Sequence, residues 1–251
     1  MFDEFKHEKF DIILQGGQSN ANGNGIGPVE EEYIPDDDII YMTRFMEMHR
    51  AEERFRDHDQ NYAGDFSLTF AKNYKEKGLL ASGRKILIVR TAVGGTGFNE
   101  HHWGIGDPMY EHMMEMVQIA LDMNHENRLV AFLWHQGESD EGTSAALTKE
   151  RIITLVRSVQ EKYNCPSLPF ICGDFVHEWR EHKESVLSVI SGLISACIDL
   201  GNSRFVLTDN LTSNNQILGN GDILHFSRDA LHKLGDRYFA AYYDLIGGSQ
   251  C

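Results

Sequence analysis

The sequence predicts a single α/β domain, residues 1–251, with helix layers on both faces of a mostly parallel central sheet. Short apolar runs alternate with longer amphipathic segments along the chain. The main apolar runs are continuous rather than alternating, which is typical of strands buried on both faces. A chain of 251 residues, 41% of them hydrophobic, is long enough for one large core. We find no internal repeat, low-complexity tract or linker that would divide it.

The predicted strands are six apolar runs, the second of which is the weakest: Phe10–Gln15, Ile39–Met42, Lys85–Thr91, Leu129–His135, Leu168–Phe175 and Arg204–Asp209. Helical patterns separate most of them. Parallel strands need long crossover connections, and helices usually supply these, so the alternation favours a parallel sheet.

The predicted helices are five segments with apolar residues at helical spacing: 65–78, 107–126, 143–163, 183–201 and 227–248. Asp65 is a good N-cap for the first of them, and Gly78 suits its end. Pro108 occupies a first-turn position, which proline tolerates. The segment Gly23–Gly64 is less regular, and we expect a long surface excursion near the ligand face, with one strand inside it.

Charge and cysteine content exclude several classes of protein. The net charge of −15 disfavours nucleic acid and anionic membrane surfaces as partners, and it favours neutral over acidic sugars unless a local basic pocket intervenes. The four cysteines lie far apart without a Cys-x-x-Cys pair, so we expect free thiols. The charged start contains no apolar signal core, and no apolar stretch approaches about 18 residues. We therefore expect a cytoplasmic protein without a membrane span.

Glycine-rich polar loops follow four of the predicted strands: GGQSN, AVGGTGF, QGESDEG and NLTSNNQILGNGDILHFS. Ligands of open parallel sheets bind beyond the carboxyl ends of the strands, so these loops should meet at one edge. They contain Ser19 and, three residues apart before the expected N-cap Ser227, Asp222 and His225. A hydroxyl, an imidazole and a carboxylate are the groups required for serine acyl transfer. Each piece alone is more often structural, as a turn or a capping pair, and it is their joint placement that favours catalysis.

Four blocks, GGQSNANG, AVGGTGF, WHQGESD and GDILHFS, resemble the successive blocks of the SGNH-hydrolase superfamily. More narrowly, they are similar to its carbohydrate acetylesterases: acetylxylan esterases of carbohydrate esterase family 6 and sialate O-acetylesterase-like domains. The resemblance extends from about Phe10 to about Tyr243. It implies a flavodoxin-like SGNH-hydrolase fold and hydrolysis of acetylated carbohydrate without a metal or other cofactor. Relatives commonly carry methionine after Gln-Ser-Asn, whereas this chain has Ala21.

Carried over by position, the resemblance implies roles for individual residues. Ser19 would be the nucleophile, His225 the general base and acid, and Asp222 its partner. The oxyanion hole would consist of the backbone N–H groups of Ser19 and Gly95 and the side-chain amide of Gln136. Glu138 matches the acid of the QGESD block, and we expect either a secondary acid or a structural role.

The loop after the glycine pair carries aromatic side chains near the expected cleft. Phe98, His101, His102 and Trp103 are our candidate sugar platform, because aromatic faces pack against the apolar faces of sugar rings. Tyr33 and Trp179 are weaker candidates. The alternative is that Phe98 and Trp103 only cover the edge of the sheet. For the whole protein, two other functions stay open: a lipid or thioester hydrolase with a long acyl channel, and a non-catalytic carbohydrate-binding relative.

Overall fold

The computed structural model describes residues 2–56 and 61–247 and confirms the α/β class. Its central sheet has seven strands in the order β3-β2-β6-β1-β7-β8-β9. All neighbouring strands are parallel except β3, which runs antiparallel to β2 at the edge. The strands are β1 (Phe10–Gly17), β2 (Ile39–Met42), β3 (Met48–Arg50), β6 (Lys85–Arg90), β7 (Arg128–His135), β8 (Phe170–Gly173) and β9 (Ser203–Val206).

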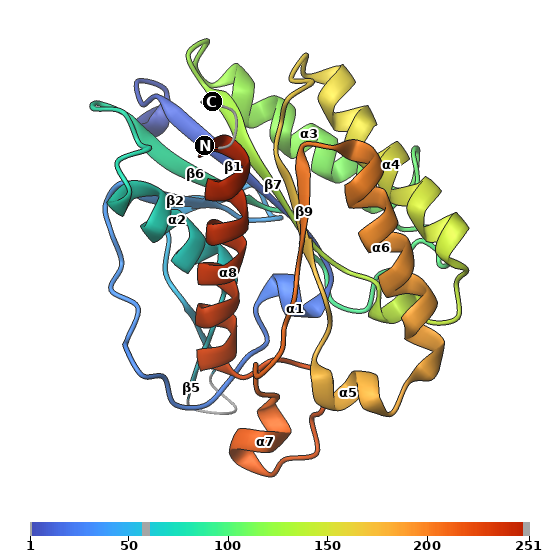
Figure 1. Ribbon diagram of the computed structural model, residues 1–251. Helices are drawn as coiled ribbons and strands as arrows, with labels where there is room; N and C mark the ends of the chain where they lie inside the picture. The colour runs from blue at the N-terminus through green and yellow to red at the C-terminus, as the bar shows by residue number, and fades with distance from the viewer. Residues whose placement is uncertain (1, 57–60, 248–251) are drawn as a thin grey trace.

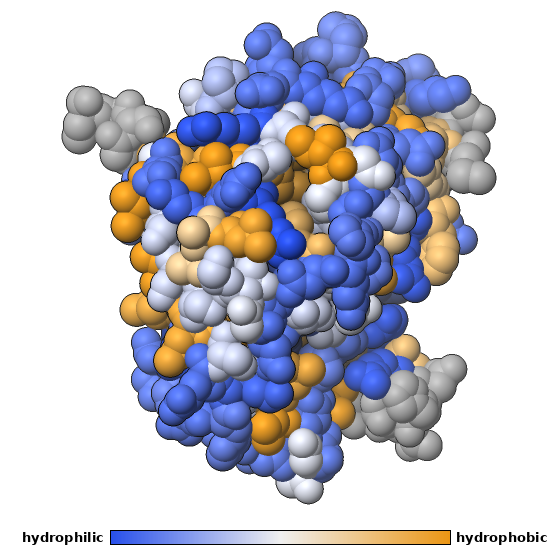
Figure 2. Space-filling view, turned by 90° about the vertical axis from the view of Figure 1, so that its right-hand side faces the viewer, coloured by the Kyte–Doolittle hydropathy of each residue, from blue (hydrophilic) through white to orange (hydrophobic). Residues whose placement is uncertain are grey.

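Helices cover both faces of this sheet (Figure 1). One face carries α2 (Phe66–Glu76) and α8 (Arg228–Gly247), which pack on each other. The other carries α3 (Pro108–Asp122), α4 (Ala145–Lys162) and α6 (Leu187–Leu200). The α4–α6 side faces the viewer in Figure 2 and is mainly hydrophilic, with small separate hydrophobic patches. No helix in the described part of the chain is long and apolar enough to cross a membrane.

Local signals place the long helices as expected. The Asp65 carboxylate accepts from the Ser67 N–H and caps α2, and the Ser227 hydroxyl accepts from Ala230 at the start of α8. The apolar stripe of α8 is buried because it lies on the sheet and on α2: Leu231, Leu234, Tyr238, Tyr242 and Leu245.

The irregular segment contains more structure than one strand. Besides β2 it forms β3 and a separate hairpin of β4 (Arg54–Arg56) and β5 (Asn61–Ala63). These strands have three residues each, too short to show a period in the sequence. The last strand of the sheet, β9, also ends three residues earlier than expected, at Val206 opposite Gly173, the last residue of β8. Beyond it, the carbonyls of Leu207 and Asp209 accept from Arg237.

Short elements gather at the end of the sheet where β1 leads into α1 (Ser19–Asn22), at the lower end in Figure 1. They include α5 (His177–Glu181) and α7 (Asn214–Leu218). Three single-turn 3₁₀ helices complete the fold: η1 (Asp3–Phe5), η2 (Glu138–Asp140) and η3 (Glu184–Val186). This edge is therefore where the polar loops predicted from the sequence meet.

Candidate active site

Ser19 is presented by an abrupt strand-to-helix turn. The strand β1 pairs with β7 as far as Gly17 opposite His135. Gly17 has φ +129°, and a Cβ there would lie 2.1 Å from the His135 carbonyl oxygen, so the close crossing requires glycine. Ser19 is the first residue of α1, where a backbone N–H has no acceptor within the helix. The turn thus places a hydroxyl and an available N–H donor together.

His225 and Asp222 form the expected pair. Nδ1 of His225 lies 3.0 Å from both carboxylate oxygens of Asp222, and the His225 backbone N–H donates to the same group. The Asn214 amide also donates to Asp222. Burial alone would raise the pKa of Asp222, but these hydrogen bonds outweigh it and lower the pKa to about 2. Asp222 is therefore ionised at neutral pH and holds the imidazole through Nδ1.

Ser19 and His225 line the same open cavity of about 600 Å³. Gly95 and Glu138 also line it, and an added Cβ on Gly94 would lie 3.5 Å from the Cβ of Ser19. Within the described residues, no hydrogen bond joins the Ser19 hydroxyl to the imidazole of His225. Catalytic hydrogen bonds without substrate are often long and tighten only in the substrate complex. The arrangement brings together all three side chains of the predicted triad, with the Ser–His contact still open.

Asn20 ties the segments of the site together, a role that the sequence did not reveal. Its side-chain NH₂ donates to Glu138 at 2.8 Å and to the Leu224 carbonyl at 3.2 Å. Its side-chain oxygen accepts from the Phe226 N–H. One buried amide therefore connects the serine turn, the segment after β7 and the histidine loop. The only signal in the sequence was its place directly after Ser19.

Glu138 is buried at the wall of the cavity, with 5% of its surface exposed. Burial raises its pKa to about 7, although the hydrogen bond from Asn20 opposes the shift. Its second oxygen, Oε2, is buried without a hydrogen-bond partner among the described residues. A carboxyl group that titrates near neutrality, close enough to His225 to sense its charge, can respond to protonation of the imidazole.

The two glutamines near the site differ from expectation. The NH₂ of Gln136 donates to Asp140 at 2.6 Å and to the Thr96 carbonyl, and Gln136 does not line the Ser19 cavity. The Asp140 carboxylate thus holds the amide that was expected in the oxyanion hole. Gln18 lines the cavity instead. Its oxygen accepts from the Ser139 N–H at 3.1 Å, which leaves its NH₂ as the end available to a ligand.

The residues of the expected sugar platform lie away from the Ser19 cavity. Phe98 and Trp103 are buried, 8% and 0% exposed, and the Trp103 indole N–H donates to the Thr96 hydroxyl. His102 accepts from the Gly97 N–H, and Phe98, His101 and Trp103 line a different surface hollow of about 360 Å³. None of the four lines the Ser19 cavity, because the loop folds back onto Trp134.

The aromatic side chain that lines the cavity is Trp179 of α5, beside Leu224. The sequence offered it only as a weaker candidate for sugar binding, and with 7% of its surface exposed it reaches the cavity by one edge.

The described residues do not assemble a metal site or a redox-active disulfide. They contain no group of three or more His, Cys, Asp or Glu side chains placed to hold a metal ion. Cys165, Cys172 and Cys197 are free thiols. The Sγ atoms of Cys172 and Cys197 are 3.5 Å apart, which is contact distance and not a disulfide. Cys251 lies outside the described residues.

A serine at a strand end, an Asp–His pair before the last helix and a parallel sheet define the class of SGNH-type carbohydrate esterases. Within it, residues 9–244 match the family described as carbohydrate esterase, sialic acid-specific acetylesterase. The chain belongs to this family and is an acetylesterase, a carboxylic ester hydrolase. Of the two groups that the sequence resembles, the description of this family names the sialic acid-specific acetylesterases.

Individual relatives agree with this assignment. A probable 9-O-acetyl-N-acetylneuraminic acid deacetylase of Escherichia coli K12 is 26% identical, with 72% of each chain covered. The crystal structure of NanS superposes with a TM-score of 0.78 at 21% identity, covering 96% of this chain and 98% of that one. A carbohydrate acetylesterase from Xanthomonas citri superposes with a TM-score of 0.62 at 14% identity, covering 95% and 57%. The two superpositions show that the fold is shared.

Proposed function

We propose that the protein removes O-acetyl groups from sialic acids through an acyl-enzyme on Ser19. The observation that carries this proposal is the shared cavity of Ser19 and His225, with His225 held through Nδ1 by an ionised Asp222. The family match and the name of the Escherichia coli relative support an acetylated sialic acid as the substrate. Acetylated neutral sugars are the alternative class.

In the first step, Nε2 of His225 takes the proton of the Ser19 hydroxyl while the oxygen attacks the acetyl carbonyl. Asp222 keeps the imidazole in the correct tautomer and stabilises the imidazolium that forms. The protonated His225 then gives its proton to the departing sugar oxygen, leaving acetyl-Ser19. Water attacks this ester with His225 again as base, and acetate leaves as the proton returns to Ser19.

Three donors are available for the oxyanion. The backbone N–H groups of Ser19 and Gly95 border the cavity. We assign the third place to the side-chain NH₂ of Gln18 in place of Gln136, because Gln18 lines the cavity and its oxygen is held by Ser139. Donors fixed before the reaction stabilise the developing charge without reorganisation.

Substitution of the nucleophile tests the proposal. We expect Ser19→Ala to lower kcat for acetate release from 9-O-acetyl-N-acetylneuraminic acid by about 10³-fold or more, because no other hydroxyl replaces the attacking oxygen. Ser139→Ala is the matched control, a second serine in the same cavity, and should stay within a few-fold of wild type. Near-full activity of Ser19→Ala, with the thermal transition unchanged, would refute the mechanism. A wild-type preference for octanoyl over acetyl esters would favour a lipid hydrolase instead.

A further inference from the structure

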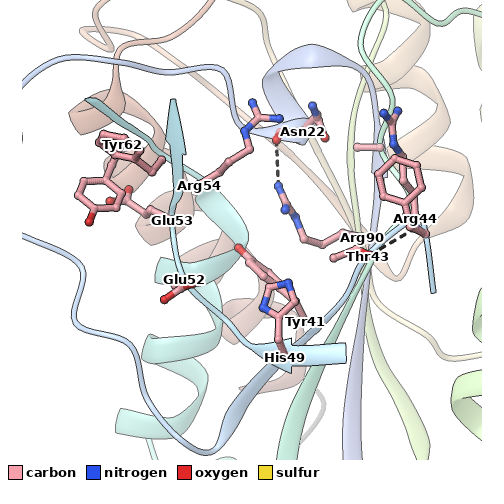
Figure 3. A pocket seen from close by; sticks show the side chains of 13 residues that line it. Asn22, Tyr41, Thr43, Arg44, His49, Glu52, Glu53, Arg54, Tyr62 and Arg90 are labelled. Carbon is pink, nitrogen blue, oxygen red and sulfur yellow. Dashed lines mark hydrogen bonds between the residues drawn. The ribbon is translucent and has the colours of Figure 1, made fainter. Parts of the chain in front are cut away.

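A second cavity of about 480 Å³ lies on the other side of α1 from the Ser19 cavity. It is formed by residues of α1, of β2, β3 and the turn between them, of the β4–β5 hairpin and of the end of β6. Its side chains are shown in Figure 3, and the polar ones that matter below are Asn22, Arg44, Glu52, Glu53, Arg54 and Arg90. Most of these residues belong to the segment Gly23–Gly64, which was expected only as a surface excursion. The proposed mechanism uses none of them.

Three guanidinium groups gather in this cavity. In Figure 3, Arg54 of β4 and Arg90 of β6 extend toward Asn22, and Arg44 lies to the other side of Asn22, in the turn between β2 and β3. Arg90 donates to the Asn22 carbonyl and lies 4.5 Å above the ring of Tyr41. Burial and the nearby positive charges of Arg90, Arg56 and Arg44 lower the pKa of Arg54. The guanidinium groups are therefore close enough to repel one another, in a protein whose net charge is −15.

The charges of this cluster are only partly balanced. Arg90 forms an ion pair with Asp65 at 2.8 Å. Within the described residues, no carboxylate lies within ion-pair distance of Arg44 or Arg54. Arg44 packs on the ring of Phe45, 4.8 Å from its centre. Among the described residues, Arg54 has only the neutral partners Gly23 and Asn24, so the positive charges of Arg44 and Arg54 are not neutralised there.

The carboxylates near the cavity do not neutralise Arg44 or Arg54. Glu53 is buried and engaged by Arg228 and His232. Glu52 is exposed, and Figure 3 places it on the opposite side of the cavity from Arg44.

The arginine cavity and the Ser19 cavity share a wall. Arg54 donates to the Gly23 carbonyl and to the side chain of Asn24, and Asn24 lines the Ser19 cavity. Asn22 is three residues after Ser19 in α1, a rise of about 5 Å along a helix. The two cavities therefore adjoin opposite ends of the same short helix, with Ser19 lining one and Asn22 the other.

We propose that Arg44 and Arg54 form the subsite that binds the carboxylate of an acidic sugar while its acetyl ester lies at Ser19. Planar guanidinium groups suit carboxylates because they donate paired hydrogen bonds with matching geometry. This inference rests on the proposed function and adds its specificity: the enzyme selects substrates by their negative charge. The local cluster would oppose the long-range repulsion of an anion by the acidic surface.

A matched pair of substrates tests the subsite. The substrates are 9-O-acetyl-N-acetylneuraminic acid and its methyl ester, which has the same acetyl group but no negative charge. We expect the wild-type protein to prefer the acid in kcat/KM by about tenfold or more, since each arginine supplies charge-assisted hydrogen bonds. Arg44→Gln and Arg54→Gln should bring this ratio close to one, mainly through the KM of the acid, and Arg44→Lys should retain part of it.

Arg157→Gln is the control, because Arg157 is an exposed arginine on α4, on the opposite face of the sheet. It should leave the ratio at its wild-type value. Equal loss of activity on both substrates in the Arg44 and Arg54 variants would overturn the subsite and indicate a structural role, and so would an unchanged ratio. If the wild-type protein releases acetate from neither substrate, the proposed function fails instead, so the two failures are distinguishable.

Discussion

Two loops at the same edge of the sheet differ in whether they bury or expose a large side chain. The loop after β6 turns Trp103 into the core, where it is 0% exposed. The segment before α8 leaves the side chain of His225 22% exposed at the cavity. Both loops are rich in glycine and polar residues, so composition does not separate them. The difference shows that position after a strand locates the catalytic edge, but not which side chains face it.

Hydrogen-bond partners explain the contrast. The Trp103 indole N–H donates to Thr96 inside its own loop, and the ring lies edge-on to Trp134 with 5.0 Å between centres. Its only polar group is satisfied without solvent, so burial is favourable. His225 has a partner for Nδ1 in Asp222. Within the described residues its Nε2 has none, so that nitrogen remains for Ser19 or substrate.

Alanine substitutions at Trp103 and Trp179 test this contrast and have the largest expected effects. Trp103→Ala should lower the free energy of unfolding by about 3–5 kcal/mol, because it leaves a cavity beneath the sheet edge. Once the fraction folded is accounted for, its rates on p-nitrophenyl acetate and on an acetylated sialic acid should change together. Thermal and denaturant unfolding monitored beside both assays would check this.

Trp179→Ala is the comparison, because Trp179 lines the Ser19 cavity. It should weaken hydrolysis of the sugar ester several-fold more than that of the small ester. A selective loss for sugar in Trp103→Ala would reverse the assignment and restore the loop after β6 as the platform.

Much of the fold could be predicted because its signals are local. Continuous apolar runs marked the strands of the sheet centre, and β2 was placed at its observed limits, Ile39–Met42. Ser19, Asp222 and His225 could be singled out because they follow strands or precede a helix cap, positions that depend on a few neighbouring residues. The short strands β3, β4 and β5 could not, because their pairing depends on distant partners.

The parts of the site that the sequence missed depend on tertiary contacts. Asp140 binds the NH₂ of Gln136, and because of this tertiary contact we assign the oxyanion donor to Gln18 instead of Gln136. The arginine cavity combines residues from β6 and from the irregular segment, and no spacing in the sequence connects Arg44 with Arg90. Overall acidity predicted neutral substrates, but net charge carries no information about one local cluster.

Gln18 and Gln136 allow a similar comparison between a side chain at the cavity and one held away from it, with smaller expected effects. Gln18→Ala should lower kcat about 100-fold with little change in KM, the usual effect of removing one oxyanion donor. Gln136→Ala should instead lower stability by about 1–3 kcal/mol, because Asp140 loses a buried donor. Steady-state kinetics and unfolding curves on both variants separate these outcomes. If Gln136→Ala carries the kcat loss while Gln18→Ala does not, the oxyanion assignment returns to Gln136.

Glu138 is the intermediate case, a side chain that is buried and yet lines the cavity. Its pKa in the folded protein is about 7, against an ordinary value of 4.5, mainly because burial disfavours its charge. Between these pH values the folded state holds a proton that the unfolded state releases, so the contribution of Glu138 to stability falls as pH rises from about 4.5 to about 7. Glu138→Gln stays neutral, so its stability relative to wild type should rise through this range and level off above it, reaching roughly 1–3 kcal/mol at pH 8. Denaturant unfolding at pH 4, 6 and 8 measures the rise, and Glu141→Gln, an exposed neighbour, should show none. A gain independent of pH would mean that the pKa of Glu138 is the same in the folded and unfolded states. Glu138 would then be ionised at neutral pH and could not respond to His225.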